Sequence, residues 1–302
     1  FNFGVEHELL KDFQVSVHYI IKKRGNLLGS VLWDEESDRY WYSHELAPEW
    51  WIPFTTIVPA YGSFPEQEVT MYFLSNDAPD QFYRLKNVPE ASWKFRSLEI
   101  AFNKRMSNGW QLGGSANFSK NPGNYPVSWQ SSSSFGVFSN ANSFVNRYGE
   151  MPYSRPTIIK LYGTFNLPYQ IMFSFIFQHV DGSPWGRTVR VLPPEQWAAE
   201  HNVSSTGYSI NVETPGTRWN EPYDNLDIRF QKDFRLGPGN LGFYVDIFNL
   251  LGAYTLTINK NPGGTWRPVN EATSEGSFTP GSLGLRGFSG SRQIRFSVLY
   301  RF

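Results

Sequence analysis

The fold is decided by the last eleven residues, Arg292-Gln293-Ile294-Arg295-Phe296-Ser297-Val298-Leu299-Tyr300-Arg301-Phe302. Apolar or aromatic side chains occupy every even-numbered position from 294 to 302, and most of the positions between them are polar or charged. Successive side chains of a β-strand point to opposite faces of its sheet. The alternation therefore predicts a strand with one apolar face and one wet face, ending on an aromatic residue.

The same alternation recurs along the chain. In 157–167 the odd-numbered positions form the apolar face, and Lys160, Thr164 and Asn166 lie on the other. Nine such segments are predicted as strands, at about 1–9, 13–23, 92–104, 109–120, 155–167, 170–180, 222–234, 240–250 and 288–302. Only 193–202 has a short helical pattern. The predicted fold class is all-β, although a soluble sandwich would alternate in the same way.

Connection lengths distinguish these two architectures. Short turns near 10–12, 106–109, 167–169 and 235–240 alternate with long connections at 24–91, 121–154, 181–221 and 251–286. Outer-membrane barrels have short periplasmic turns and long extracellular loops, and their strands need about 9 to 11 residues. The sequence therefore predicts a transmembrane antiparallel β-barrel with long extracellular loops. Loop 24–91 could hide a further hairpin at about 56–61 and 69–74.

The composition of the chain excludes several classes of site and of function. The chain has 302 residues, 40% of them hydrophobic, and no cysteine, so disulfide frameworks and thiolate sites are excluded. Lys plus Arg equal Asp plus Glu at 27 each, and a net charge of zero predicts no long-range field that would attract nucleic acid or anionic lipid. No apolar run is long enough for a membrane-spanning helix. Only a barrel could cross a membrane.

Segments 227–234 (DIRFQKDF), 243–251 (FYVDIFNLL) and 292–302 resemble the last three strands of TonB-dependent outer-membrane transporters and receptors. They are most similar to the Oar-like group, which carries an N-terminal carboxypeptidase-regulatory-like domain, and 4–9 with 15–20 resembles an earlier hairpin of that group. The resemblance implies a 22-stranded barrel occluded by an N-terminal plug. It implies that residues 1–302 are the C-terminal part of that barrel, strands 14 to 22. The plug domain and earlier strands are then absent from this chain, as the odd count of nine strands also suggests.

The resemblance also implies a function in the bacterial outer membrane. Ligand would be captured by the long loops and released inward when TonB displaces the plug, without covalent chemistry, so we expect no enzymatic activity and no cofactor. Expected partners are outer-membrane lipid, the TonB complex through the missing N-terminal region, and a surface lipoprotein, with no nucleic acid. Two alternatives stay open. One is a passive porin or adhesion-type barrel, and the other is a soluble all-β glycan-binding module with Trp-rich loops.

Several residues are candidates for a site. Trp41, Trp50, Trp51 and Trp197 fall in predicted loops and could stack on a ligand, or they could form small cores within those loops. Under the barrel model the inward-facing, lumen-lining polar residues are Lys160, Asn225, Asp227, Arg229, Gln231, Arg295 and Arg301. None of the five histidines has metal-ligand spacing, so no metal site is predicted. The sequence 237–242 (GPGNLG) matches a dinucleotide fingerprint but predicts a hairpin turn, because a strand follows it.

Overall fold

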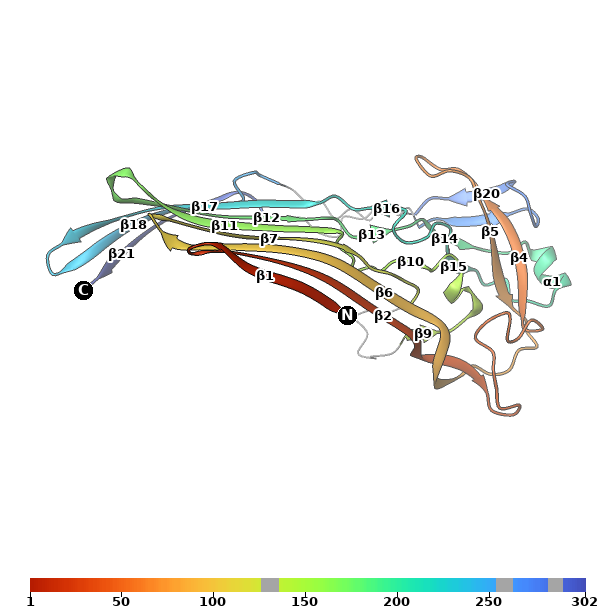
Figure 1. The fold of residues 1–302 in the computed structure, drawn as a ribbon. Helices are drawn as coiled ribbons and strands as arrows, with labels where there is room; N and C mark the ends of the chain where they lie inside the picture. Colours follow the sequence, from red (N-terminus) through yellow and green to blue (C-terminus); the bar gives the residue numbers. More distant parts are fainter. Residues whose placement is uncertain (126–135, 254–262, 282–289) are drawn as a thin grey trace.

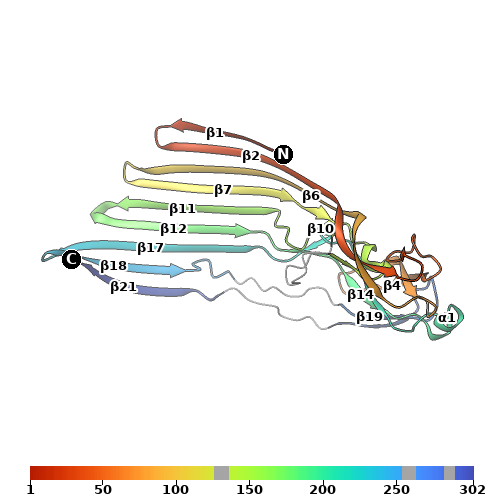
Figure 2. The same cartoon turned by 90° about the horizontal axis from the view of Figure 1, so that it is seen from below.

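The computed structural model describes residues 1–125, 136–253, 263–281 and 290–302. Within them, nine long strands of an antiparallel sheet follow one another in the order β1-β2-β6-β7-β11-β12-β17-β18-β21 (Figures 1 and 2). Their bounds are β1 Asn2–Leu10, β2 Phe13–Asp34, β6 Phe82–Ser107, β7 Trp110–Lys120, β11 Thr157–Leu167, β12 Ile171–Val180, β17 Tyr223–Leu236, β18 Gly239–Phe248 and β21 Gln293–Arg301. The nine predicted strands are confirmed, except that part of the predicted 288–302 lies outside the described residues.

The four short turns lie together at one end of the sheet, as predicted, and the C-terminus lies at the same end (Figure 2). Each turn contains a residue in the left-handed region, at Asp12, Asn108, Tyr169 and Gly237. In the β6–β7 turn, Asn108 and Gly109 have φ of 52° and 83°, and an Asn-Gly pair with two positive φ angles matches the right-handed twist of the flanking strands. The GPGNLG segment also forms a hairpin turn, between β17 and β18, with one positive φ of 58° at Gly237 followed by Pro238.

Two strands are much longer than predicted. β2 has 22 residues and β6 has 26, and they stay paired from Phe13↔Lys104 to Trp33↔Phe82, with one register shift between Gly25 and Leu27. The predicted loop 24–91 is therefore wrong at both of its ends. Backbone pairing continues past the segment where side chains alternate. Alternation alone therefore located only the half of each strand that lies toward the short turns.

The long connections fold into a compact unit at the other end of the sheet. We call residues 27–91, 121–125, 136–156, 181–222 and 263–281 the cap. Its elements are β3 Arg39–Tyr40, β4 Trp51–Val58, β5 Gln67–Leu74, β8 Pro122–Gly123, β9 Gly136–Phe138, β10 Gly149–Glu150, β13 Pro184–Trp185, β14 Thr188–Val191, β15 Tyr208–Asn211, β16 Arg218–Trp219, β19 Thr265–Pro268, β20 Gly276–Thr279 and the helix α1 Glu195–Glu200. The predicted extra hairpin is β4–β5, which forms its own two-stranded sheet, and α1 confirms the predicted helix.

The hydrophobic core lies in the cap. One buried cluster joins β4 and β5 to β14, β15, α1 and β19, and a second joins the outer ends of β2 and β6 to segments near Trp41, Trp51 and Phe138. By contrast, β1 is exposed along its whole length and β21 along almost all of it. Among the described residues, β1 pairs only with β2 and β21 only with β18, so the sheet has two open edges.

No helix of the described residues is long and apolar enough to cross a membrane.

Candidate functional site

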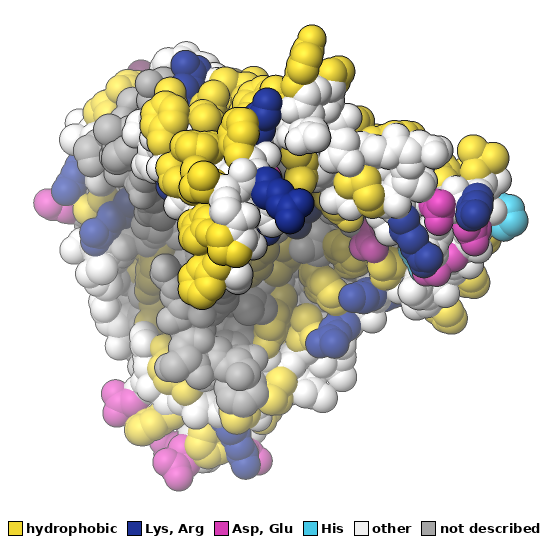
Figure 3. Space-filling view, turned by 90° about the vertical axis from the view of Figure 1, so that its left-hand side faces the viewer, with side chains coloured by type: hydrophobic (Ala, Val, Ile, Leu, Met, Phe, Trp, Pro, Cys, Tyr) yellow, Lys and Arg dark blue, Asp and Glu magenta, His cyan; other side chains and the backbone are white. Residues whose placement is uncertain are grey.

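The strand register sorts the side chains of the sheet onto two faces. Residues paired across antiparallel strands point to the same face. One face carries the apolar set, including the row Trp110↔Phe165↔Phe173↔Phe230 across β7, β11, β12 and β17. Much of this face is exposed, for example Leu98, Phe118, Phe230 and Phe296. Seen from the short-turn end, hydrophobic side chains gather on one side of the curved sheet (Figure 3).

A lysine marks the boundary of the apolar face at the short-turn end. Lys104 belongs to this face, yet its Nζ bends back to the Arg105 carbonyl at 2.8 Å and lies 4.5 Å from the centroid of the Trp110 ring. Long basic side chains place their charge in a polar zone in this way while their stems cover apolar surface. Between Arg96 and Lys104 the apolar face of β6 measures about 26 Å along the strand. In a barrel whose strands are tilted by about 40°, this length would span about 20 Å of the apolar band, which is about 25 Å tall.

All seven predicted lumen-lining residues lie on the opposite, polar face. Pairings place Lys160, Asn225, Asp227, Arg229, Gln231, Arg295 and Arg301 there through the registers of β11, β12, β17, β18 and β21. The alternation therefore predicted their common side. Some residues of this face are apolar, for example Ile176, which is 59% exposed and lies opposite Asp227, and Leu299, which is 48% exposed.

Charged residues of the polar face form one network over the last three strands. Asp246 is 3% exposed and accepts hydrogen bonds from Arg229 and from Arg295, whose Nε and Nη2 lie 3.0 and 2.8 Å from Oδ2. Arg301 extends the network to Asp233 at 3.5 Å and to the Tyr244 hydroxyl at 2.9 Å. Two guanidinium groups share the Asp246 carboxylate, so this part of the face keeps a net positive charge.

Neighbouring residues of the polar face are held by single hydrogen bonds. Asp227 accepts a hydrogen bond from the Asn249 backbone N–H at 2.8 Å, and Gln231 donates to Asp233 at 3.1 Å. Lys160 lies between Ser115 and Gln178 in register. These contacts hold a polar surface, which could bind another protein segment or a hydrated ligand.

A hollow lies on the polar face where the sheet meets the cap. His18, Glu99, Asn117 and Lys160 line it from the strands, together with Arg155. Asn121 and Tyr153 also line a second groove, which contains Arg24 and Trp93, so the two hollows are adjacent. We call the two together the junction hollow. Trp93, half-buried with Arg24 at 5.9 Å from its ring centroid, was missed by the sequence reasoning because it sits in a predicted strand.

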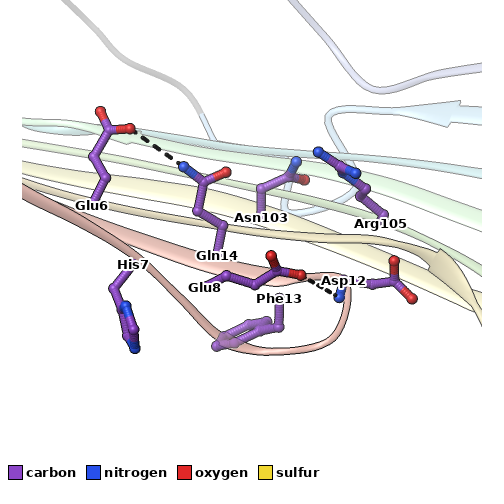
Figure 4. A pocket seen from close by; sticks show the side chains of 8 residues that line it. All are labelled: Glu6, His7, Glu8, Asp12, Phe13, Gln14, Asn103 and Arg105. Carbon is purple, nitrogen blue, oxygen red and sulfur yellow. Dashed lines mark hydrogen bonds between the residues drawn. The ribbon is translucent and has the colours of Figure 1, made fainter.

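A smaller pocket lies at the short-turn end of β1, β2 and β6 (Figure 4). Gln14 donates to Glu6 at 3.4 Å, and the Asp12 backbone N–H donates to Glu8 at 3.1 Å. Glu6, Gln14, Asn103 and Arg105 point to one side of the sheet, whereas His7 and Phe13 point to the other (Figure 4). The residues come from both faces around an open sheet edge, so this pocket is a poor candidate for a ligand site.

Three of the four candidate tryptophans have little surface to offer a ligand. Trp41 and Trp51 are 0% exposed, and the Trp51 indole N–H donates to the Trp41 carbonyl at 2.6 Å. Trp197 is 5% exposed, with His201 stacked on it at 4.3 Å and Phe54 at 4.7 Å. The expectation that these three rings stack on a ligand does not fit their burial, and the alternative of a loop core does.

Trp50 is the exception among these tryptophans, because it stays partly exposed. The Arg39 guanidinium lies 5.2 Å from its ring centroid, and Trp41 packs edge-on at 5.7 Å. Only this ring of the four could contact a ligand without rearrangement of the cap.

The cap is locked by a buried arginine. Arg187 is 0% exposed, and its side chain donates to the carbonyls of Pro65 and Pro59 at 3.1 and 2.8 Å. Its backbone N–H donates to Glu213 at 3.0 Å, and Glu213 also binds Arg218. Burial lowers the pKa of Arg187. These contacts tie the β4–β5 loop to β13 and β16.

Comparisons with known proteins add little. No protein-family model and no curated protein matches the chain. The crystal structure of the outer membrane transporter YddB from Escherichia coli aligns with 98% of this chain and 31% of its own, at 12% identity and a TM-score of 0.45. The closed form of the ferric-catecholate import receptor Fiu from Escherichia coli K12 aligns with 99% of this chain and 34% of its own, at 11% identity and a TM-score of 0.40. The chain spans about a third of either protein, and neither alignment assigns it to a family.

Across 1–125, 136–253, 263–281 and 290–302, no group of three or more metal-binding side chains comes together. His18 lies 3.3 Å from Glu6, and His179 lies 2.8 Å from Asp224. The polar face, the junction hollow and the cap surface are therefore the candidate functional surfaces, and all three suit binding.

Proposed function

We propose that this chain forms strands of an outer-membrane β-barrel that acts as a TonB-dependent transporter or receptor. One observation carries the proposal: the register gives the sheet an exposed apolar face, a charged polar face and a folded cap at the end opposite the short turns. Lipid would cover the apolar face, and the charged polar face would line a water-filled or plugged lumen. The cap then lies outside the cell and the short turns lie in the periplasm.

The two open edges support the proposal that further strands complete the barrel. In lipid, every backbone N–H and C=O must be paired, so β1 and β21 cannot both remain edges. A barrel of 22 strands, with these as strands 14 to 22, would satisfy both edges and leave a lumen wide enough to need a plug. The positive network around Asp246 would face that plug.

Ligand uptake would follow from this arrangement. The cap would capture ligand at the cell surface, and the junction hollow would lead it to the polar face, where the plug moves when TonB acts. Trp50 on the cap and Trp93 in the junction hollow would be two of the aromatic rings that a ligand meets on this route. A surface lipoprotein covering the cap is a further proposed partner. None of these steps requires the chain to catalyse a reaction.

The soluble glycan-binding alternative conflicts with the apolar face. Phe296 is 76% exposed, Val298 62% and Ile294 57%, and they sit side by side on one face of one strand. A soluble protein rarely exposes a contiguous apolar surface of this kind. The passive porin shares the apolar face, so an experiment must separate it from the plugged receptor.

The full-length protein in a planar lipid bilayer tests that difference. A plugged receptor is expected to give no steady conductance and to be captured by the isolated periplasmic domain of TonB. Steady conductance steps together with failure of TonB to capture the protein would contradict the proposal and favour the passive pore.

A further inference from the structure

The net charge of zero conceals a separation of charge between the cap and the sheet. Within the described residues, the cap holds 19 Asp and Glu against 9 Lys and Arg, whereas the rest of the chain holds 8 against 16. A net charge of zero over the whole chain thus coexists with local charge of opposite sign on the cap and on the sheet. Outside the cap, the described residues therefore carry an excess of positive charge.

Part of that charge is concentrated in a patch beside the cap. Lys23, Lys94 and Arg96 lie near the middle of β2 and β6, and Lys120 lies at the cap end of β7. We call these four residues the basic patch. Their parity places them on the apolar face, since Ile21 pairs with Arg96, and Lys120 lies two residues beyond Phe118. Lys23, Arg96 and Lys120 are exposed, and Lys94 is half-buried.

The patch brings like charges directly opposite each other. Lys23 pairs in register with Lys94, and Arg96 pairs with Lys120. Like charges opposite each other in neighbouring strands are destabilising. No side chain of the patch forms an ion pair with a carboxylate of the described residues. Glu150 and Asp181 share a groove with Lys120 but lie beyond ion-pair distance of it. An anion from outside the chain would relieve this repulsion.

Between the basic patch and the short turns, the same face is apolar and exposed. Val17, Tyr19, Leu98, Ile100 and Phe118 are between 36% and 45% exposed and continue the same strands toward the short turns. At the far end, Lys104 bonds to backbone carbonyls of its own turn, so its charge is already satisfied. Within the described residues of β2, β6 and β7 outside the cap, the basic side chains of the apolar face that lack an ion-pair partner and a backbone carbonyl are therefore those of the basic patch.

We propose that the basic patch binds the phosphorylated headgroup of a glycolipid in the outer leaflet, with its acyl chains on the apolar surface below. The phosphates supply the missing counter-charge, and the acyl chains cover Leu98, Ile100 and Phe118. Each Lys or Arg near an anionic membrane surface strengthens binding about fivefold. The inference rests on the proposed membrane placement of the sheet.

The test uses full-length protein in detergent, titrated with bisphosphorylated lipid A and followed by native mass spectrometry. Lys23→Gln is compared with Lys22→Gln, its neighbour on the opposite face, and Lys23→Gln/Arg96→Gln removes two charges of the patch. Heat-modifiable migration on gels first establishes that each variant is folded in its membrane form. Dephosphorylated lipid A is the matched ligand control.

Lys23→Gln is expected to weaken lipid A binding about fivefold and the double variant about 25-fold, with Lys22→Gln within twofold of the unmodified protein. Dephosphorylated lipid A should bind all four proteins alike. Equal binding of lipid A to the unmodified protein and the double variant would overturn the proposal, as would an equal loss in Lys22→Gln. If even the unmodified protein lacks the heat-modifiable form, the membrane placement fails instead, so the two failures are distinguishable.

Discussion

Arg295 in β21 holds Asp246 in β18 through two hydrogen bonds, from Nε at 3.0 Å and from Nη2 at 2.8 Å, both to the same carboxylate oxygen. Arg229 in β17 binds the other oxygen. One carboxylate thus links the last three strands, and its loss would leave two guanidinium groups facing each other.

We expect Asp246→Asn to lower the free energy of unfolding by about 2 kcal/mol. This is less than the 3 to 5 kcal/mol of a fully buried pair, because both arginines are about half exposed. Thermal unfolding in detergent, followed by circular dichroism, measures it. Adding Arg295→Gln should recover part of the loss, and an Asp246→Asn protein as stable as the original would show that the network is not structural.

Phe175 and Ile176 are adjacent in β12 and point to opposite faces, so they form a matched pair. Phe175→Arg would place a charge among apolar neighbours, since Phe175 pairs with Ile228, and should cost about 2 to 4 kcal/mol near the middle of a bilayer. Ile176→Arg would face Asp227 and should cost little. Refolding into lipid vesicles over a urea series measures both. Equal costs would contradict the assignment of the two faces.

The cap depends on its buried tryptophans. Trp51→Ala should destabilise it by about 3 to 5 kcal/mol, because it empties a fully buried site and removes the hydrogen bond to the Trp41 carbonyl. Trp50→Ala removes a partly exposed ring and should cost below about 1 kcal/mol. Protease digestion of intact cells reports cap opening while the strands stay protected. A Trp51→Ala cap as resistant as the original would contradict its role in the core.

Glu213 gives the cap a pH dependence. Burial by itself raises the pKa of Glu213, but hydrogen bonds from Arg218 and the Arg187 backbone outweigh it and hold the pKa below its usual value. A carboxyl with a lowered folded pKa stabilises the fold above its unfolded pKa and loses that contribution as the pH falls through the folded value. Cap stability should therefore be flat above about pH 5 and decline below about pH 4.

Glu213→Gln tests this dependence. The variant should be destabilised by about 3 kcal/mol at neutral pH, since it leaves Arg187 and Arg218 without their carboxylate, and its stability should change less with acid. Glu66→Gln, an exposed carboxylate of the β4–β5 loop, is the control. Urea unfolding followed by tryptophan fluorescence reports mainly on the cap. Parallel acid profiles for Glu213→Gln and the original protein would assign the effect to other groups.

The strands were predictable because a sheet with two different surroundings forces a period of two on the sequence, as in 292–302 and 157–167. The common side of Arg229 and Arg295 followed from the same period. The cap was not predictable in the same way, since its contacts join distant segments. Trp266, for example, donates to Thr56 at 2.8 Å across 210 positions. Loop tryptophans were therefore open to two interpretations until their burial was known.

The net charge of the whole chain did not predict how charge is distributed in the fold. Counting over the whole chain gave zero, whereas counting by structural unit separates an acidic cap from basic strands. The basic patch, moreover, depends on which residues of β2, β6 and β7 lie opposite each other, which is a matter of register. Strand periodicity alone does not fix register between neighbours.

The most direct test of the account uses the absence of cysteine from the chain. Phe296→Cys and Ser297→Cys, neighbours in β21 on opposite faces, are each labelled with an environment-sensitive fluorophore in the full-length protein, which is reconstituted with lipids that carry a quencher in their acyl chains. The account predicts strong quenching at position 296 and weak quenching at position 297. Equal quenching at the two positions, or none at 296, would contradict the claim that this sheet turns its apolar face to lipid.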